Sequence, residues 1–186
     1  MQKSSYNNQK GFTLVETLVA LSIFTISIIG LISATAGGIN NVTYSKNKIA
    51  AMALAGEGVE LVRNIRDTDA IGSTTGWADF TSQMNACSSS VGCAIDAEAL
   101  TVSACTSGGC PALRKYINAS SASYFGYQGS DTTPFVRTIK VSSVSPDEVL
   151  VTSTVSWLQG AGTKSVSTVE HLMNWFTAAS SAPITP

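Results

Sequence analysis

The chain has 186 residues, enough for about one domain and one further segment. Charged side chains make up 12% of it, about half of the roughly 25% that is usual in soluble domains. Its 12 acidic residues nearly balance its 11 basic residues, so the sequence offers no basic field for nucleic acid and no acidic tail. Ser, Thr, Gly and Ala are abundant in the second half, which is more typical of an extracellular surface or a packed polymer than of a cytosolic enzyme.

A short polar leader, residues 1–11, contains Lys3 and Lys10 and no acid. Such a positive flank stays on the cytoplasmic side of a membrane. Residues 12–39 form an apolar run that, as a helix, spans about 42 Å, more than the roughly 30 Å hydrocarbon core of a bilayer. Its small hydroxyl side chains can bond back to helix carbonyls. Glu16 is the only charged residue of the run and needs an explanation, because burying a carboxylate costs about 2.5–3.5 kcal/mol or more at the bilayer centre.

Two simple interpretations of this apolar run are a secretory signal peptide and a plain membrane anchor. A secretory signal peptide would use Ala34-Thr35-Ala36 as its cleavage site, but the apolar core of residues 12–32 is longer than the usual 7–15 residues and contains a glutamate. A plain membrane anchor also leaves Glu16 unexplained. The run contains no proline, and Gly30 and Gly37-Gly38 are the positions where we expect a helix to bend or unwind.

Residues 40–66 continue the helix with an amphipathic pattern. Apolar positions recur at spacings of three and four, at Ile49, Met52, Gly56, Val59 and Val62, and they are flanked by Leu54, Gly58, Leu61 and Ile65. Residues 12–66 are therefore predicted to form one long helix, with a membrane half at 12–39 and a water-exposed half at 40–66. Asp67-Thr68-Asp69 and the stretch 72–76 are predicted to end it.

Residues 67–186 are predicted to form a globular head. Its first part, residues 67–134, is predicted to be irregular, with a helical turn at Trp77, Phe80 and Met84 and a short strand at 99–104. Three β-rich runs follow at 135–144, 149–158 and 164–175, and the turn residues between them predict an antiparallel meander. In the first run, Phe135, Arg137, Ile139 and Val141 alternate with Val136, Thr138 and Lys140. The helix of residues 40–66 covers one face of this sheet. The predicted fold class is α+β, a long N-terminal helix packed on an antiparallel sheet of three to four strands.

The head contains four cysteines within a single stretch of 24 residues: Cys87, Cys93, Cys105 and Cys110. If the apolar run carries the head across a membrane, they lie in an oxidising compartment and are expected to pair. Their spacing lacks the paired CxxC of a zinc site, and the single histidine, His171, is distant in sequence. Three connectivities are possible. We prefer the local one, Cys87 with Cys93 and Cys105 with Cys110, in which each bridge closes a short loop.

The stretch Lys10-Gly11-Phe12-Thr13-Leu14-Val15-Glu16 resembles the processing site of type IV prepilins and pseudopilins. Residues 18–24 extend the likeness to PilV-type minor pilins. The resemblance implies a type IV pilin-like fold, cleavage between Gly11 and Phe12 by a membrane prepilin peptidase, and N-methylation of Phe12. It also implies that Glu16 recruits the subunit into a growing fibre. Cleavage creates an amine at Phe12, and this cation and the Glu16 carboxylate can neutralise each other among apolar helices.

The same resemblance implies a structural subunit rather than an enzyme. A minor pilin of a type IV pilus-like fibre is the leading expectation, and a minor pseudopilin of a type II secretion or DNA-uptake system is the alternative. The implied partners are prepilin peptidase, other pilin or pseudopilin subunits, an inner-membrane assembly platform and, before assembly, the lipid bilayer. The chain is expected to cross the inner membrane once, with a cytoplasmic N-terminus before cleavage, and then to join an extracytoplasmic fibre.

A secreted or membrane-anchored enzyme is a remote alternative, because no catalytic constellation, cofactor motif or metal motif emerges. His171 is predicted to be a partly exposed strand residue. Asp131, Asp147 and Glu148 lie in predicted turns without the spacing of calcium ligands. Gly108-Gly109 is predicted to be a loop and not a phosphate cradle.

The aromatic residues Tyr116, Tyr124, Phe125 and Tyr127 are scattered among Ser, Gly and Asn. Large side chains of this kind usually pack a loop-rich domain. The alternative is an adhesive face, formed by the Tyr-rich and Cys-rich region, that would bind a surface or a glycan in addition to the pilin role.

Overall fold

The computed structural model describes residues 11, 13–73, 75–117 and 123–175. The predicted leader 1–10, Phe12 and the tail 176–186 lie outside these residues. The chain divides into two compact units, Met1–Ser45 and Lys46–Pro186, with the division inside a long helix.

Helix α1 extends over Leu14–Gly72, through Gly30 and Gly37-Gly38 without a break. The predicted end at Asp67-Thr68-Asp69 is wrong, and the stretch that begins at Gly72 ends the helix instead. The two aspartates stay helical because other elements supply partners for them. Asp67 accepts hydrogen bonds from Arg66 and from the Trp175 indole, and Asp69 accepts one from Gln83.

The buried face of α1 in the second unit differs from the predicted stripe. Ile49 and Met52 are exposed, at 69% and 54%. The buried positions are Ala51, Leu54, Ala55, Gly58, Val59, Leu61, Val62, Ile65 and Ala70. Small residues at 51, 55 and 58 bring the helix backbone close to the sheet, so the hydrophobic pattern alone misplaced the face by a fraction of a turn.

A short helical region follows α1. Helix α2 covers Gly76–Gln83, and the 3-10 helix η1 covers Met84–Cys87. Phe80 and Met84 are buried, which confirms the predicted helical turn, and the Trp77 ring packs on Phe80 with centroids 5.3 Å apart. This region therefore closes one end of the core.

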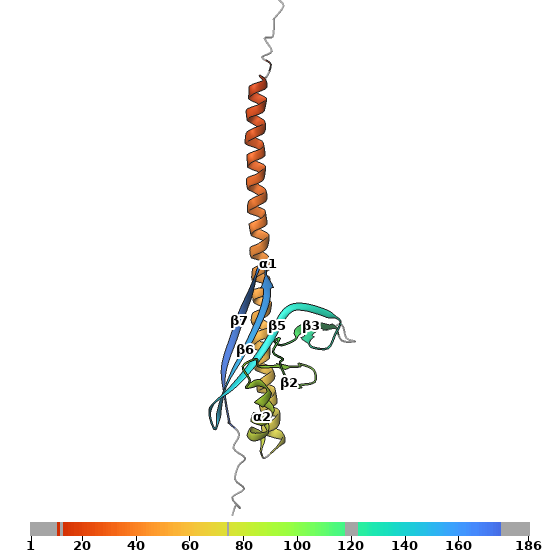
Figure 1. Cartoon of the computed structure of the whole chain (residues 1–186), viewed down its shortest axis with the longest axis vertical. Helices are drawn as coiled ribbons and strands as arrows, with labels where there is room; N and C mark the ends of the chain where they lie inside the picture. Colours follow the sequence, from red (N-terminus) through yellow and green to blue (C-terminus); the bar gives the residue numbers. More distant parts are fainter. Residues whose placement is uncertain (1–10, 12, 74, 118–122, 176–186) are drawn as a thin grey trace, which may run out of the picture. The chain divides into compact units, whose positions relative to one another are not determined.

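Seven strands form one antiparallel sheet in the described part of the chain. They are β1 (Cys93–Ile95), β2 (Val102–Ala104), β3 (Ala112–Ile117), β4 (Ser123–Gly126), β5 (Asp131–Ser145), β6 (Glu148–Gln159) and β7 (Gly162–Met173). The last three are the predicted meander, with each strand paired to the next (Figure 1). The α+β class is confirmed, whereas the count of three to four strands and the irregular assignment of 67–134 are wrong.

The four additional strands attach to the second edge of β5. Strand β3 pairs there through Ala112 and Val136, and β1 pairs further along through Cys93 and Ile139. Strands β4 and β2 complete the two hairpins. The predicted strand at 99–104 is shortened to β2. Each of these strands has three to six residues, too few for a reliable periodic pattern in the sequence.

One face of the sheet lies on α1 (Figure 1). Alternate residues of β5 and β6 are buried there, including Ile139, Val141, Val149 and Val151, and they pack with Val59, Val62 and Ile65 of the helix. The alternation predicted for residues 135–144 places the correct set on this face. The other face carries hydroxyl side chains, such as Thr154 and Ser167, whose oxygens lie 2.8 Å apart.

Candidate functional site

The predicted processing segment lies directly before α1. Thr13 precedes the first helical residue, Leu14, and its Oγ1 accepts a hydrogen bond from the backbone N–H of Glu16 at 3.3 Å. Thr-x-x-Glu at a helix start is the pattern of a capping box. Gly11, two residues before Thr13, therefore lies outside the helix, where the backbone can be presented to a protease in an extended form.

Glu16 occupies the first turn of α1 and is exposed. A carboxylate at this end of a helix is stabilised by the positive end of the helix dipole, typically by about 0.3–1 kcal/mol. Among the described residues, no side chain forms an ion pair with it. Its predicted partner, the amine at Phe12, lies outside the described residues, so their pairing stays a prediction.

The apolar run after Glu16 is long and apolar enough to cross a membrane, and no other helix of the described residues meets that criterion. Large apolar side chains on all sides of it are exposed within the chain, including Leu18, Phe24 and Ile29. Several of its hydroxyls donate to carbonyls three or four residues earlier, as expected: Thr17, Ser22, Thr25, Ser27 and Thr35. These bonds leave few polar groups unsatisfied against lipid.

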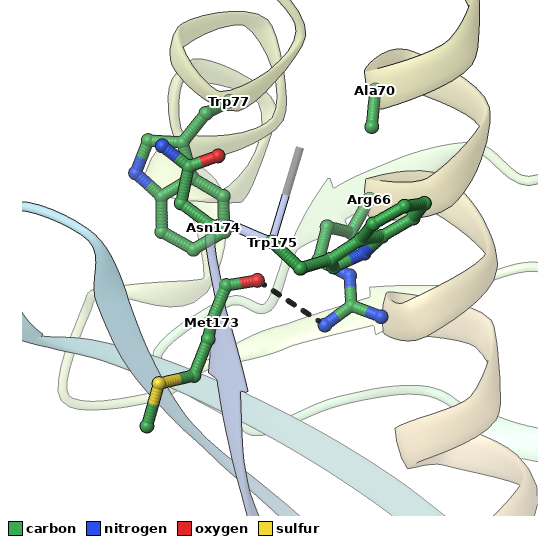
Figure 2. Close-up of a pocket in the computed structure, with 6 residues that line it drawn as sticks. All are labelled: Arg66, Ala70, Trp77, Met173, Asn174 and Trp175. Atoms are coloured by element: carbon green, nitrogen blue, oxygen red, sulfur yellow. Dashed lines mark hydrogen bonds between the residues drawn. The ribbon is translucent and has the colours of Figure 1, made fainter. Parts of the chain in front are cut away.

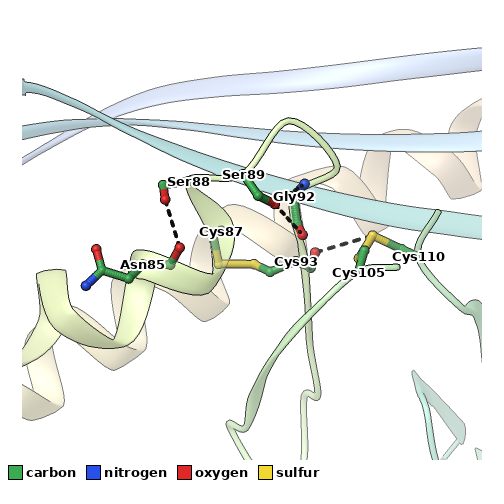
Figure 3. The surroundings of a disulfide bond; sticks show 8 residues. All are labelled: Asn85, Cys87, Ser88, Ser89, Gly92, Cys93, Cys105 and Cys110. Atoms are coloured by element: carbon green, nitrogen blue, oxygen red, sulfur yellow. Dashed lines mark hydrogen bonds between the residues drawn. A yellow bond between two sulfur atoms is a disulfide. The ribbon is translucent and has the colours of Figure 1, made fainter. Parts of the chain in front are cut away.

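Both cysteine pairs form disulfides, and the pairing is the local one preferred from the sequence (Figure 3). Cys87–Cys93 is fully buried and joins η1 to β1. Cys105–Cys110 closes the turn after β2, and the Cys105 N–H donates to the Gly92 carbonyl at 3.0 Å. Cys110 Sγ lies 3.7 Å from the Cys93 carbonyl oxygen, which is a packing contact because a disulfide sulfur has no proton to donate. The disulfides thus hold the β1–β2 hairpin against the core.

Arg137 is a buried charge that the sequence interpretation did not single out. It lies on the helix-facing side of β5 and has no exposed surface. Its guanidinium donates to the carbonyls of Leu54 and Ile95 and lies 3.3 Å from the Glu57 carboxylate. The alternation of residues 135–141 places Arg137 on the apolar face of the strand. A charged residue at such a position is the signal that could have identified it as a buried charge. Glu60 pairs with Arg63 on the same helix, at 2.6 Å, whereas Glu57 pairs across to the sheet.

Asp96, just after β1, is a second buried charged residue. Burial is the largest single influence on its pKa and acts to raise it. The backbone N–H groups of Ala99, Tyr127 and Glu98 outweigh burial, with help from the charge of Arg137, and hold the pKa of Asp96 below its ordinary value. Asp96 thereby fixes the loops around the β1–β2 hairpin and the segment after β4.

The aromatic group of residues 116–127 is divided by the fold. Tyr116 and Tyr124 face each other across β3 and β4, with ring centroids 4.8 Å apart. Tyr127 is half-buried, and burial raises the pKa of its hydroxyl. Much of this group therefore packs the head, as the simpler interpretation predicted.

The residues considered for enzymatic or metal chemistry lie apart or have structural partners. His171 is a strand residue with a 55% exposed side chain, and its Nδ1 lies 2.5 Å from a Glu148 oxygen. Asp147 accepts a hydrogen bond from Asn174, and Asp131 begins β5. Within the described ranges, no three His, Cys, Asp or Glu side chains gather into a possible metal site.

Two hollows of the head lie near α2. The first has a volume of about 10 Å³, about one water, and lies among Arg66, Trp77 and Trp175 (Figure 2). There Arg66 donates to the Met173 carbonyl at 3.4 Å and ties α1 to the end of β7. The second is larger, about 370 Å³, and lies between the α2–η1 region and the β5–β6 turn.

The comparisons with known proteins assign only the N-terminal part of the chain. Residues 6–32 match the prokaryotic N-terminal methylation motif, which is the signature of type IV prepilins. Comparison with curated proteins and with solved structures returned no match. The apolar helix that begins within this motif fits anchoring in the inner membrane. The N-terminal signature and the α+β architecture together make the chain similar to type IV pilins and pseudopilins.

Proposed function

We propose that the chain is a structural subunit, a minor pilin of a type IV pilus-like fibre. The observation that carries the proposal is the motif match at residues 6–32 together with a helix that begins at Leu14, just past the expected cut. Prepilin peptidase cleaves between Gly11 and Phe12, Phe12 becomes an N-methylated first residue, and the apolar helix then packs among the helices of other subunits. The assembly platform and those subunits are its partners.

Glu16 is proposed as the assembly residue. The carboxylate has no ion-pair partner among the described side chains, and an apolar surface surrounds it, so an unpaired charge there is costly in lipid or in a helix bundle. The amine created at Phe12, in the same chain or a neighbouring one, supplies the opposite charge. The Thr13 cap gives Glu16 a competing role, which is to start the helix.

Intact-mass analysis of the protein extracted from membranes tests the cleavage. The expected product begins at Phe12 with one added methyl group. A product that begins at Gly37 would show cleavage after Ala34-Thr35-Ala36 and would refute the proposal in favour of a signal peptide. Gly11→Leu should leave the leader attached, and the matched control Gly30→Leu, the same change in the apolar run, should be cleaved normally.

Substitutions at Glu16 separate its two possible roles. Glu16→Gln keeps a side chain suited to the capping box but removes the charge, whereas Glu16→Ala removes both. If charge pairing drives assembly, both variants are processed normally and both are depleted in sheared fibres. Loss with Glu16→Ala alone would assign the residue to helix capping. Thr17→Ala, one position away, is the control and should assemble normally.

A minor pseudopilin of a type II secretion or DNA-uptake system is the second candidate, since the same motif serves both classes. Deletion of the chain distinguishes them. A minor pilin alters surface fibres and leaves protein secretion and DNA uptake unchanged, whereas a pseudopilin alters secretion or uptake.

A further inference from the structure

The larger hollow of the head has the size and chemistry of a ligand pocket. Its volume of about 370 Å³ falls within the usual range of about 300–1,000 Å³ for small-molecule sites. Buried Met84, Val141 and Val149 are among its lining residues and offer apolar surface. Its lining includes neither the Tyr116–Tyr124 pair nor Glu16, so the pocket is separate from the aromatic packing and from the proposed assembly residue.

One wall of the pocket is fixed by Trp77. The indole N–H donates to the Pro146 carbonyl at 2.7 Å, which joins α2 to the β5–β6 turn across the pocket. Phe80 packs beside the ring and is fully buried. The ring therefore presents carbon surface rather than a hydrogen-bond donor, and the two sides of the pocket are held together without a ligand.

The rest of the lining is polar but carries no charge. It includes Thr81, Asn85 and Ser88 from the α2–η1 region and Ser143 and Ser145 from the β5–β6 hairpin. The hydroxyls of Thr81, Ser88 and Ser143 donate to nearby carbonyls, so their remaining lone pairs can accept. The Asn85 side chain is exposed and makes no side-chain hydrogen bond with the described residues, so its amide can both donate and accept.

This lining selects against ionic ligands. A phosphate or carboxylate would lose hydration on entry and would meet no counter-charge. A purely aliphatic ligand would leave the Asn85 amide and the hydroxyls without partners on the ligand side. A neutral sugar has the matching surface, because its C–H face packs on an aromatic or aliphatic wall and its hydroxyls bond with amides and hydroxyls at the rim.

We propose that this pocket, between the α2–η1 region and the β5–β6 turn, binds one neutral sugar residue of a glycan. Trp77 and the apolar lining contact the C–H face, and Asn85 and the serine hydroxyls bond to the hydroxyl groups. The binding surface differs from the Tyr-rich and Cys-rich face considered from the sequence. It does not depend on whether the chain belongs to a pilus or to a pseudopilus.

Saturation-transfer NMR of the full-length protein tests this proposal, in a polyoxyethylene detergent that has no sugar headgroup. The probes are glucose, galactose, mannose, N-acetylglucosamine and N-acetylgalactosamine, with glucuronic acid and N-acetylneuraminic acid as charged comparisons. At least one neutral sugar should receive saturation, and the charged sugars should receive none. Transfer to no neutral sugar, or equal transfer to the charged ones, would overturn the proposal.

Variants locate the site. Ala78 lines the pocket and is exposed, whereas Ser82 is exposed on the same helix and does not line it. Ala78→Trp should weaken sugar binding at least tenfold, and the control Ser82→Trp should leave it unchanged. Asn85→Ala, at an exposed position where folding is not at stake, should weaken binding about tenfold. Unchanged binding in both Ala78→Trp and Asn85→Ala contradicts the assignment.

A side chain from a neighbouring subunit is the competing occupant. Short uncharged peptides with a central leucine or phenylalanine, tested in the same measurement, cover this case. If they bind in an Ala78-dependent way and no sugar does, the pocket is a protein-docking site and the sugar proposal is wrong.

Discussion

Gly58 is a position of α1 where the sheet leaves no room for a side chain. A Cβ atom there would lie 2.2 Å from Ser153 Oγ and 3.1 Å from both Ser153 Cβ and Arg137 Cδ. Ser153 lies inside β6 with no exposed surface, and Arg137 is equally buried. Rotation of the Ser153 hydroxyl can relieve the first contact but not the other two. We therefore expect Gly58→Ala to cause overpacking that costs about 1–3 kcal/mol.

Gly56, two residues earlier on the same helix, provides the control. A Cβ atom there would meet nothing within 4 Å. Gly56→Ala should stabilise the protein by about 0.5–1 kcal/mol, because alanine has the higher helix propensity. Both variants gain this propensity, so the difference in unfolding free energy between them, about 1–3 kcal/mol, measures the contact with the sheet alone.

Urea unfolding of the full-length protein in detergent, followed by tryptophan fluorescence, gives these free energies, since Trp157 is buried in the core of the head. Ser153→Ala removes the hydroxyl that the new methyl group meets. The double variant Gly58→Ala/Ser153→Ala should therefore recover part of the loss, with a coupling of about 0.5–3 kcal/mol. Equal stability of Gly58→Ala and Gly56→Ala would refute the close approach of helix and sheet.

Three further perturbations test the interior of the head. Arg137→Met should lower the unfolding free energy by about 1–3 kcal/mol, because two backbone carbonyls lose a buried donor, and an unchanged urea midpoint would contradict this. Asp96 has a pKa below its ordinary value in the folded state, so its contribution to stability is complete above the unfolded-state pKa of about 3.9 and is lost as pH falls through the folded-state pKa. The fall in stability between pH 4 and 2 should therefore be shallower in Asp96→Asn than in the parent, and equal slopes would exclude this role. Replacement of Cys87 and Cys93 by Ala should cost at least about 2 kcal/mol, the loop-entropy value for so short a loop, and a thermal midpoint equal to that of the parent would show that the buried bridge adds nothing.

The parts of the fold that the sequence predicted are those with long, regular patterns. The apolar run and its continuation predicted α1, and the three β-rich runs of residues 135–175 with their turns predicted β5, β6 and β7. The alternation of residues 135–144 also predicted the correct buried set on β5. Local spacing determines both features, because a helix repeats every 3.6 residues and a strand every two. The helical turn around Phe80 followed from the same reasoning over a shorter stretch.

Three of the four short strands, β1, β3 and β4, could not be predicted in this way, whereas the strand predicted at 99–104 corresponds to β2. Strand β1 has three residues, all buried, and therefore no alternation to detect. Its place is set by long-range features, the pairing of Cys93 with Ile139 and the bridge to Cys87. The helix face was predicted only in part, because Val59 and Val62 of the expected stripe are buried but Ile49 and Met52 are exposed. Ala51, Ala55 and Gly58 are buried instead, and the sheet comes close to the backbone at Gly58, whereas a scale that rewards large apolar residues favours Ile49 and Met52.

The two proposed sites differ in the same way, which explains why one was visible in the sequence and the other was not. The proposed processing and assembly residues, Gly11, Phe12 and Glu16, lie in one short stretch of the chain, so their spacing in the sequence is enough to identify them. The pocket brings Trp77 and Asn85 of the α2–η1 region to Val141 and Ser145 of a hairpin about 60 residues away, so only the closed core defines it. An uncharged, polar lining gives that pocket its selectivity, because no lining residue can compensate a charged ligand.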